Sequence, residues 1–140
     1  MSAQAEFATG CDVVDIARLA EVIDRRSGFV ERVFTERERA DARRGGVASG
    51  SWTERSRLAA RFAAKEATRK ALGALDLGFH AVEVRSEPDG SPQLWVRGEA
   101  SGLACSLSHD AGIALAVVVG PAPAHPADVP EPTTDSHSVA

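Results

Sequence analysis

The stretch RFAAKEATRKALG, residues 61–73, decides how this sequence is interpreted. Its apolar positions recur at helical spacing, and the same face is continued upstream by Leu58. The helix is expected to begin at the capping pattern between Ser51 and Glu54. It is expected to end at Gly73, because glycine is typical of a helix C-terminal cap. This is the longest element that the sequence predicts.

The same stretch holds the only two lysines of the chain, Lys65 and Lys70, in a sequence that otherwise uses arginine at every basic position. Glu66 lies four positions before Lys70, so a carboxylate and an ammonium share one face of the helix. Spacing alone favours a surface ion pair worth about 0.3–0.5 kcal/mol. Glu66 also continues the line of Leu58 and Phe62, at the edge of the buried side, where an unpaired carboxylate is costly. A divalent metal or a phosphate-bearing ligand would remove that cost.

Length and composition indicate one soluble domain, since the chain has 140 residues, of which 44% are hydrophobic and 26% charged. No run approaches the roughly 20 apolar residues of a membrane span, and the N-terminal sequence MSAQAEFATG has no signal-peptide pattern. We therefore expect a cytoplasmic protein with no membrane partner. Cys11 and Cys105 form neither a disulfide framework nor a zinc motif and are expected to be small buried residues.

Charge is unevenly distributed along the chain. The net charge is −4, but three acids lie in the last twenty residues, where no base offsets them. Residues 18–70 hold 14 lysines and arginines against 8 acids, an excess of 14 − 8 = 6 positive charges. This region could face an anionic partner. The alternative is a set of solvated helix faces with ion pairs such as Glu54 with nearby arginines.

Two helical patterns precede the long helix. ATGCDVVDI, residues 8–16, is expected to form a strand that passes directly into a helix over residues 16–26. Thr35 followed by Glu38 predicts a capping box for a second helix that runs to Gly45 and Gly46.

After the long helix the pattern changes to alternation. Residues 80–87 and 93–98 predict a hairpin around Asp-Gly, and CSLSHDAGIALAVVVG, residues 105–120, predicts two more strands around a tight turn. Helices first and antiparallel strands later predict an α+β domain over residues 1–120. Five of the seven prolines lie in residues 121–140, which are expected to be a disordered tail.

Five segments together resemble the holo-acyl-carrier-protein synthase type of 4′-phosphopantetheinyl transferase. In order, over roughly residues 9–120, they are GCDVVDIARL, FTERE, RFAAKEATRKALG, DGSPQLWVRG and SLSHDAGIALAVVV. The resemblance implies a small antiparallel sheet packed with helices around one long central helix, and a homotrimer with active sites between neighbouring subunits. It also implies transfer of phosphopantetheine from coenzyme A to a serine of an apo acyl carrier protein of fatty acid or polyketide synthesis. That reaction requires magnesium and releases adenosine 3′,5′-bisphosphate.

The resemblance gives roles to Asp12 in the first strand and to Glu66 and Lys70 in the long helix. Asp12 and Glu66 match the family's two metal-binding acids, and magnesium suits them because it takes few protein carboxylates. For Asp12 the alternative is a capping or turn aspartate where the strand meets the helix. Lys70 matches a lysine that reaches the diphosphate of coenzyme A and follows its charge. Together with His109 and Asp110, Glu66 and Lys70 are the expected catalytic residues.

Five further residues acquire expected roles from the same resemblance. Lys65 contacts a coenzyme phosphate or faces solvent. Ser108 and His109 match a motif that lies at the coenzyme phosphates, where an imidazole is drawn toward its charged form. Asp110 accepts the serine proton or serves as an Asx-type turn residue. Arg18 meets the acidic recognition helix of the carrier protein.

The sequence departs from the family pattern in two places. The segment over residues 98–106 is shorter than in the family, which usually has a full helix there, and the loop over residues 74–79 is brief. Both lie beside the expected coenzyme site or trimer contact.

Two other functions compete with the enzyme. One is a binding module of the same fold whose site has decayed, against which the intact Asp12, Glu66, Lys70 and His109 argue. The other is an arginine-rich nucleic-acid-binding domain. Only 5% of residues are aromatic and the basic residues are interleaved with acids, which is poor for base stacking, so we expect no nucleic acid partner.

Overall fold

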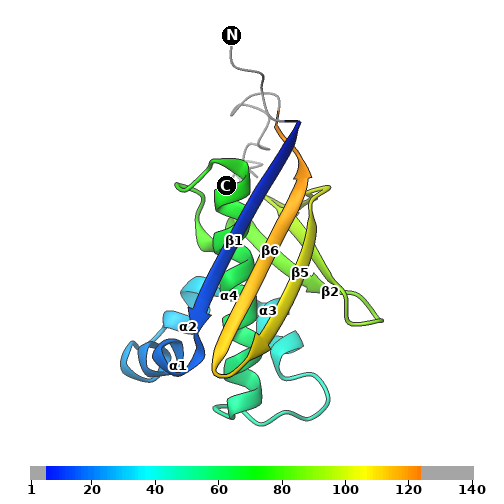
Figure 1. Ribbon diagram of the computed structural model, residues 1–140. Coiled ribbons are helices and arrows are strands. Elements are labelled where there is room, and N and C mark those ends of the chain that lie inside the picture. Colours follow the sequence, from blue (N-terminus) through cyan, green and yellow to red (C-terminus); the bar gives the residue numbers. More distant parts are fainter. Residues whose placement is uncertain (1–5, 124–140) are drawn as a thin grey trace, which may run out of the picture.

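Helix α4 (Trp52–Leu72) is the central element of the computed structural model, which describes residues 6–123 (Figure 1). It begins and ends where the sequence predicts. The Ser51 hydroxyl accepts a hydrogen bond from the amide of Glu54, and Gly73 caps the other end in the left-handed conformation with φ of 61°. The buried side of α4 consists mainly of alanines, so neighbouring strands can approach the helix axis closely.

Two antiparallel sheets of three strands lie beside α4, where the sequence predicted one small sheet. The first sheet has the strand order β1-β6-β5 and packs one face on α4, and the second has the order β2-β3-β4 (Figure 1). The strands are β1 (Phe7–Asp15), β2 (Val82–Ser86), β3 (Pro92–Val96), β4 (Glu99–Ala100), β5 (Ala104–Asp110) and β6 (Ile113–Pro121). Both predicted hairpins are confirmed, β2 with β3 and β5 with β6.

The remaining helices are short and pack around α4. They are α1 (Ile16–Arg25), α2 (Phe29–Val33), α3 (Glu36–Ala42) and the 3-10 helix η1 (Phe79–Ala81). Strand β1 passes directly into α1, and Asp15 caps this helix by accepting a hydrogen bond from the amide of Arg18. The predicted capping box of Thr35 and Glu38 is present with both hydrogen bonds. Helix α3 ends at Ala42, before the glycines where the sequence placed its end.

The first sheet has a buried inner face and an exposed outer face. Gly10 makes the closest approach of the inner face to α4, since a Cβ atom there would overlap with the backbone of Ala67 and Ala71. The outer face is apolar, and we define the outer apolar face by its exposed large side chains: Phe7, Val13, Ile113, Leu115, Val117 and Val119. Cys11 lies on the same exposed face, so the expectation that it is buried is wrong.

The C-terminal boundary extends slightly beyond the prediction. Strand β6 includes Pro121, and the amide of Ala122 donates to the carbonyl oxygen of Glu6 at 3.1 Å. The rest of the predicted tail, residues 124–140, lies outside the described residues. None of the helices within residues 6–123 is long and apolar enough to cross a membrane.

Lys65 is fully buried, so both predictions for it, a coenzyme contact and a solvent-facing side chain, are wrong. Its ammonium lies 2.6 Å from Glu38 Oε1 and donates to the carbonyl oxygens of Phe79 at 2.8 Å and Val82 at 2.5 Å. Burial lowers the pKa of Lys65 and raises the pKa of Glu38, while the attraction between the two charges opposes both shifts. Lys65 therefore joins α4 to α3, η1 and β2.

Replacing Lys65 by methionine is expected to destabilise the fold by about 3–5 kcal/mol, because Glu38 is then buried without a counterion. The double variant Lys65→Met with Glu38→Gln should recover most of that loss. Lys70→Met is the matched control, since the Lys70 side chain is 48% exposed and its loss should cost about 1 kcal/mol or less. Urea unfolding measures all three, and equal stability of the two single variants would contradict the role of the buried pair.

Gly10→Ala is expected to destabilise the protein by about 1–3 kcal/mol, because the added methyl group forces β1 away from α4. Gly78→Ala is the control, since Gly78 has a φ of −62° and open space where its added methyl group would lie. Thermal unfolding compares the two variants. A Gly10→Ala protein as stable as Gly78→Ala would show that the strand and helix are not in close contact.

Candidate active site

Asp12 lies in the middle of β1 on the inner face, beside α4. Lys70 from the last turns of α4 donates to Asp12 Oδ1 at 3.1 Å and to the carbonyl oxygen of Cys11 at 3.0 Å. The alternative of a helix-capping aspartate is wrong for Asp12, because Asp15 takes that position. The structure therefore brings together two of the predicted site residues, which are 58 positions apart in the chain.

Glu66 lies one turn before Lys70 on α4 and is part-exposed, as expected for the edge of the buried side. The ion pair that spacing favoured, Glu66 with Lys70, is not formed. Arg69 takes its place, with Nη1 at 2.7 Å from Glu66 Oε1. Lys70 turns instead toward β1, so each of the two predicted metal-binding acids has its own basic neighbour.

The two carboxylates, Asp12 and Glu66, could hold a magnesium ion. Their side chains are 19% and 23% exposed, so both are accessible to a ligand while resting on rigid elements. Within residues 6–123 no group of three or more histidine, cysteine, aspartate and glutamate side chains could enclose a metal ion. Two acids nevertheless suit magnesium, which fills its octahedron with water and phosphate oxygens rather than with a complete set of protein ligands.

A shallow cavity of about 440 Å³ adjoins Asp12 on the side of α1. Arg18 lies on its rim, and Leu19, Val22 and Phe62 supply an apolar lining. Arg18 is exposed. Its backbone amide donates to Asp15 in the helix cap, and its guanidinium takes no part in that hydrogen bond. Asp12 and Arg18 are thus close enough to face one ligand or one partner surface.

His109 lies on the other flank of α4. In the register of the first sheet, Asp12 on β1 pairs with Ala116 on β6, which pairs with Leu107 on β5. His109 is two positions beyond Leu107 and therefore on the same inner face, but at the opposite edge of the sheet from β1. The helix packs over the strand between these edges, so within one chain α4 separates His109 from the Asp12 cluster.

The cavity that His109 lines is basic and has a volume of about 470 Å³. Arg44, Arg57 and Arg61 contribute to its wall, together with the single acid Asp41. Arg61 is anchored through Nη2 to the Ser86 hydroxyl at 3.0 Å, and Arg57 donates to the carbonyl oxygen of Arg44 at 2.8 Å. A pocket of this charge suits a phosphate-bearing ligand. The sequence indicated only an excess of positive charge over residues 18–70, because it does not show which arginines converge.

Ser108 and Asp110 lie on the outer face of the first sheet, since they alternate with Leu107 and His109 along β5. Within one chain, Ser108 therefore does not reach the cavity that His109 lines. Asp110 lies at the turn between β5 and β6, where its Oδ1 accepts a hydrogen bond from the amide of Ala111 at 2.8 Å, one residue on and not the two residues of an Asx-type turn. A role of Asp110 as proton acceptor stays a prediction.

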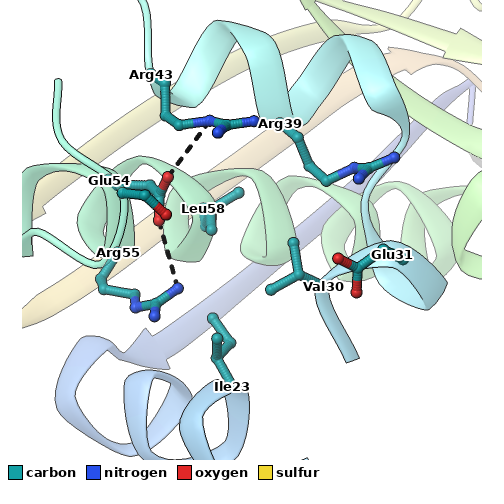
Figure 2. A pocket seen from close by; sticks show the side chains of 9 residues that line it. Ile23, Val30, Glu31, Arg39, Arg43, Glu54, Arg55 and Leu58 are labelled. Atoms are coloured by element: carbon teal, nitrogen blue, oxygen red, sulfur yellow. Dashed lines mark hydrogen bonds and ion pairs between the residues drawn. The ribbon is translucent and has the colours of Figure 1, made fainter. Parts of the chain in front are cut away.

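A third cavity, of about 260 Å³, lies between the helices at the N-terminal end of α4 (Figure 2). Glu54 is its central charge and contacts Arg43 at 3.6 Å and Arg55 at 3.4 Å. Arg55 continues to Asp24 on α1 at 3.0 Å. The alternative of ion pairs between Glu54 and nearby arginines is confirmed here, and this network joins α1, α3 and α4.

Comparison with known proteins identifies the family of the chain. The family model described as 4′-phosphopantetheinyl transferase superfamily matches residues 8–118. The holo-[acyl-carrier-protein] synthase of Salinispora arenicola is 43% identical over 122 residues, which cover 80% of this chain and 95% of that protein. The enzyme of the same name from Streptomyces coelicolor is 42% identical over 122 residues, with 79% and 93% coverage.

Solved structures show the same relationship. The ACPS–CoA complex of Chronobacterium ammoniagenes has a TM-score of 0.71 and 28% identity, and the match covers 85% of this chain and 99% of that chain. A holo-(acyl-carrier-protein) synthase from Bacillus anthracis in complex with CoA has a TM-score of 0.66 and 32% identity, with 83% and 96% coverage. The chain therefore belongs to the 4′-phosphopantetheinyl transferase superfamily, among relatives of the holo-acyl-carrier-protein synthases.

Proposed function

We propose that this chain is a holo-acyl-carrier-protein synthase, which transfers 4′-phosphopantetheine from coenzyme A to a serine of an apo acyl carrier protein. The observation that carries the proposal is the contact of Lys70 with Asp12, one turn of α4 after Glu66, in a chain 43% identical to an enzyme of that name. Adenosine 3′,5′-bisphosphate is the leaving group, because the serine oxygen replaces one side of the coenzyme's diphosphate bridge. The compartment is the cytoplasm, and residues 1–120 form the catalytic domain.

Asp12 and Glu66 would hold magnesium in this proposal. When bound, the ion neutralises charge on the diphosphate and helps to align it with the attacking serine. The exposed fractions of the two side chains and their attachment to a strand and a helix support this assignment. Few protein ligands are required, because the phosphate oxygens of coenzyme A complete the coordination.

Lys70 stabilises the negative charge that accumulates as the phosphorus–oxygen bond breaks. Its ammonium has three donors, and in the structure two of them are accounted for by Asp12 and the carbonyl oxygen of Cys11. The third is available for a phosphate oxygen. The flexible side chain is 48% exposed, so it can follow the charge as the leaving group departs.

The basic cavity lined by His109, Arg57 and Arg61 is the proposed site for the phosphate groups at the nucleotide end of coenzyme A. Phosphate oxygens pair with guanidinium groups in bidentate geometry, and the ring nitrogens of an imidazole can donate hydrogen bonds to them as well. The anchored position of Arg61 supports a preformed pocket. Ser108, on the other face of β5, contributes only if another copy of the chain adjoins it.

A homotrimer with active sites between neighbouring copies explains why the two clusters lie on opposite flanks of α4. In such an assembly, His109 of one copy serves the Asp12 and Glu66 of the next. The outer apolar face supports association, because Val13 and Phe7 are 59% and 65% exposed and adjoin four further exposed apolar side chains of β6. A continuous apolar face of this kind is typical of contacts between copies.

The partner that presents the serine is an apo acyl carrier protein, whose recognition helix is acidic. The position of Arg18 in the lining of the cavity beside Asp12 supports a contact with that helix. The excess of 6 positive charges over residues 18–70 would steer the encounter, and salt would weaken it.

Incubation with coenzyme A, magnesium and an apo carrier protein is expected to add one phosphopantetheine group, which intact mass spectrometry detects. Glu66→Gln should lose at least about a hundredfold in turnover, together with the magnesium dependence, while remaining folded, because a metal-binding carboxylate is gone. A panel of fatty acid and polyketide carriers identifies the preferred partner. Coenzyme A binding without any mass gain on the panel would instead indicate a binding module that has lost catalysis.

Two inactive variants, Glu66→Gln and His109→Ala, are expected to restore activity when they are co-expressed with different tags and purified as mixed oligomers. Each variant supplies the group that the other lacks, so about one of the three sites in every mixed trimer should be intact. Size-exclusion chromatography with light scattering gives the number of copies. Mixed oligomers that stay inactive would contradict a site shared between copies.

A further inference from the structure

Arg69 lies directly before Lys70 on α4, and its guanidinium is fixed by two groups other than Glu66. Nη2 donates to the carbonyl oxygen of Leu75, just beyond the end of the helix. The guanidinium carbon also lies 5.2 Å from the ring centroid of Phe79, at cation–π distance. Phe79 is itself stacked on Phe62, with ring centroids 5.6 Å apart. The position of Arg69 therefore does not depend on Glu66.

The contact from Arg69 engages only one oxygen of Glu66. Nη1 lies 2.7 Å from Oε1, whereas Oε2 accepts no hydrogen bond from residues 6–123. Glutamate has a flexible side chain, and a fixed donor to one oxygen limits the directions in which the other can point. Carboxylates that ligate metals are commonly held in this way by a neighbouring hydrogen-bond donor.

We propose that Arg69 is a positioning residue, which holds Oε1 of Glu66 so that Oε2 is presented to the magnesium ion. The inference rests on the proposed function, because it assumes that Glu66 is a metal ligand. Arg69 is only 17% exposed and anchored, whereas Lys70 beside it is 48% exposed. Arg69 thus holds Glu66 in a fixed position, whereas Lys70 is the more mobile partner of Asp12.

The change in magnesium affinity on removal of Arg69 distinguishes a positioning role from competition between Arg69 and magnesium for Glu66. A cation that only competes with magnesium for Glu66 weakens metal binding, so its removal would tighten binding. A positioning residue strengthens metal binding, so its removal weakens it. The two roles predict opposite changes in magnesium affinity.

The test measures magnesium affinity by calorimetry in the presence of coenzyme A, and independently by the magnesium dependence of transfer. Arg69→Gln is expected to weaken magnesium binding by about 10-fold or more. The KM for the carrier protein at saturating magnesium should be unchanged. Arg69→Lys should recover part of the affinity, because it keeps a cation within reach of Glu66 but loses the planar fork that also binds Leu75.

Arg85→Gln is the matched control. Arg85 also pairs with a glutamate, Glu83 at 2.6 Å, and stacks on an aromatic ring, Trp95 at 3.7 Å, but on the hairpin of β2 and β3. Its loss should leave magnesium affinity as in the unaltered protein. Unchanged or tighter binding in both Arg69 variants, with an active unaltered enzyme, would overturn the positioning role and leave the proposed function intact. An unaltered protein with neither transfer nor magnesium binding would overturn both.

Discussion

The contact between β1 and α4, made through the smallest side chains of the protein, is the constraint on which the site depends. Gly10 lies so close to the backbone of Ala67 that no larger residue fits. Two positions further along β1, Asp12 is consequently within reach of the side chain of Lys70. A bulkier pair at the contact would push strand and helix apart and weaken the contact between Asp12 and Lys70. The alanine-rich face of α4 is therefore a requirement of the site as well as of the core.

The two lysines illustrate how the number of acceptors around an ammonium group decides its role. The ammonium of Lys65 has three donors and meets three acceptors, Glu38 and the carbonyl oxygens of Phe79 and Val82. It is fully satisfied and fully buried, so its role is structural. An arginine at this position would present its donors in one plane, whereas these three acceptors are arranged around a single nitrogen atom. Lys70 meets two acceptors and is half exposed, which leaves it one donor for a ligand.

Local patterns in the sequence predicted the helices and strands well. They predicted contacts between side chains of different elements less well. The capping box at Thr35, the glycine cap at Gly73 and both hairpins depend on neighbouring residues and are confirmed. The burial of Lys65 could not be predicted, because its partner Glu38 comes from another helix and already forms part of a capping box. Likewise, Arg69 and not Lys70 pairs with Glu66, because Lys70 donates to two acceptors on β1, a carboxylate and a carbonyl oxygen.

Strand β5 places residues of the proposed site on both faces of the first sheet. Residues on one strand alternate between faces, so His109 faces α4 of its own chain while Ser108 and Asp110 face outward. In the proposed trimer the outward pair lies toward another copy. The pairing of β5 with β6 runs unbroken from Ala104 to Asp110, and the short segment over residues 98–103 enters at the end away from His109. The pairing with β6 therefore fixes both faces of β5, whatever the length of the connection that precedes it.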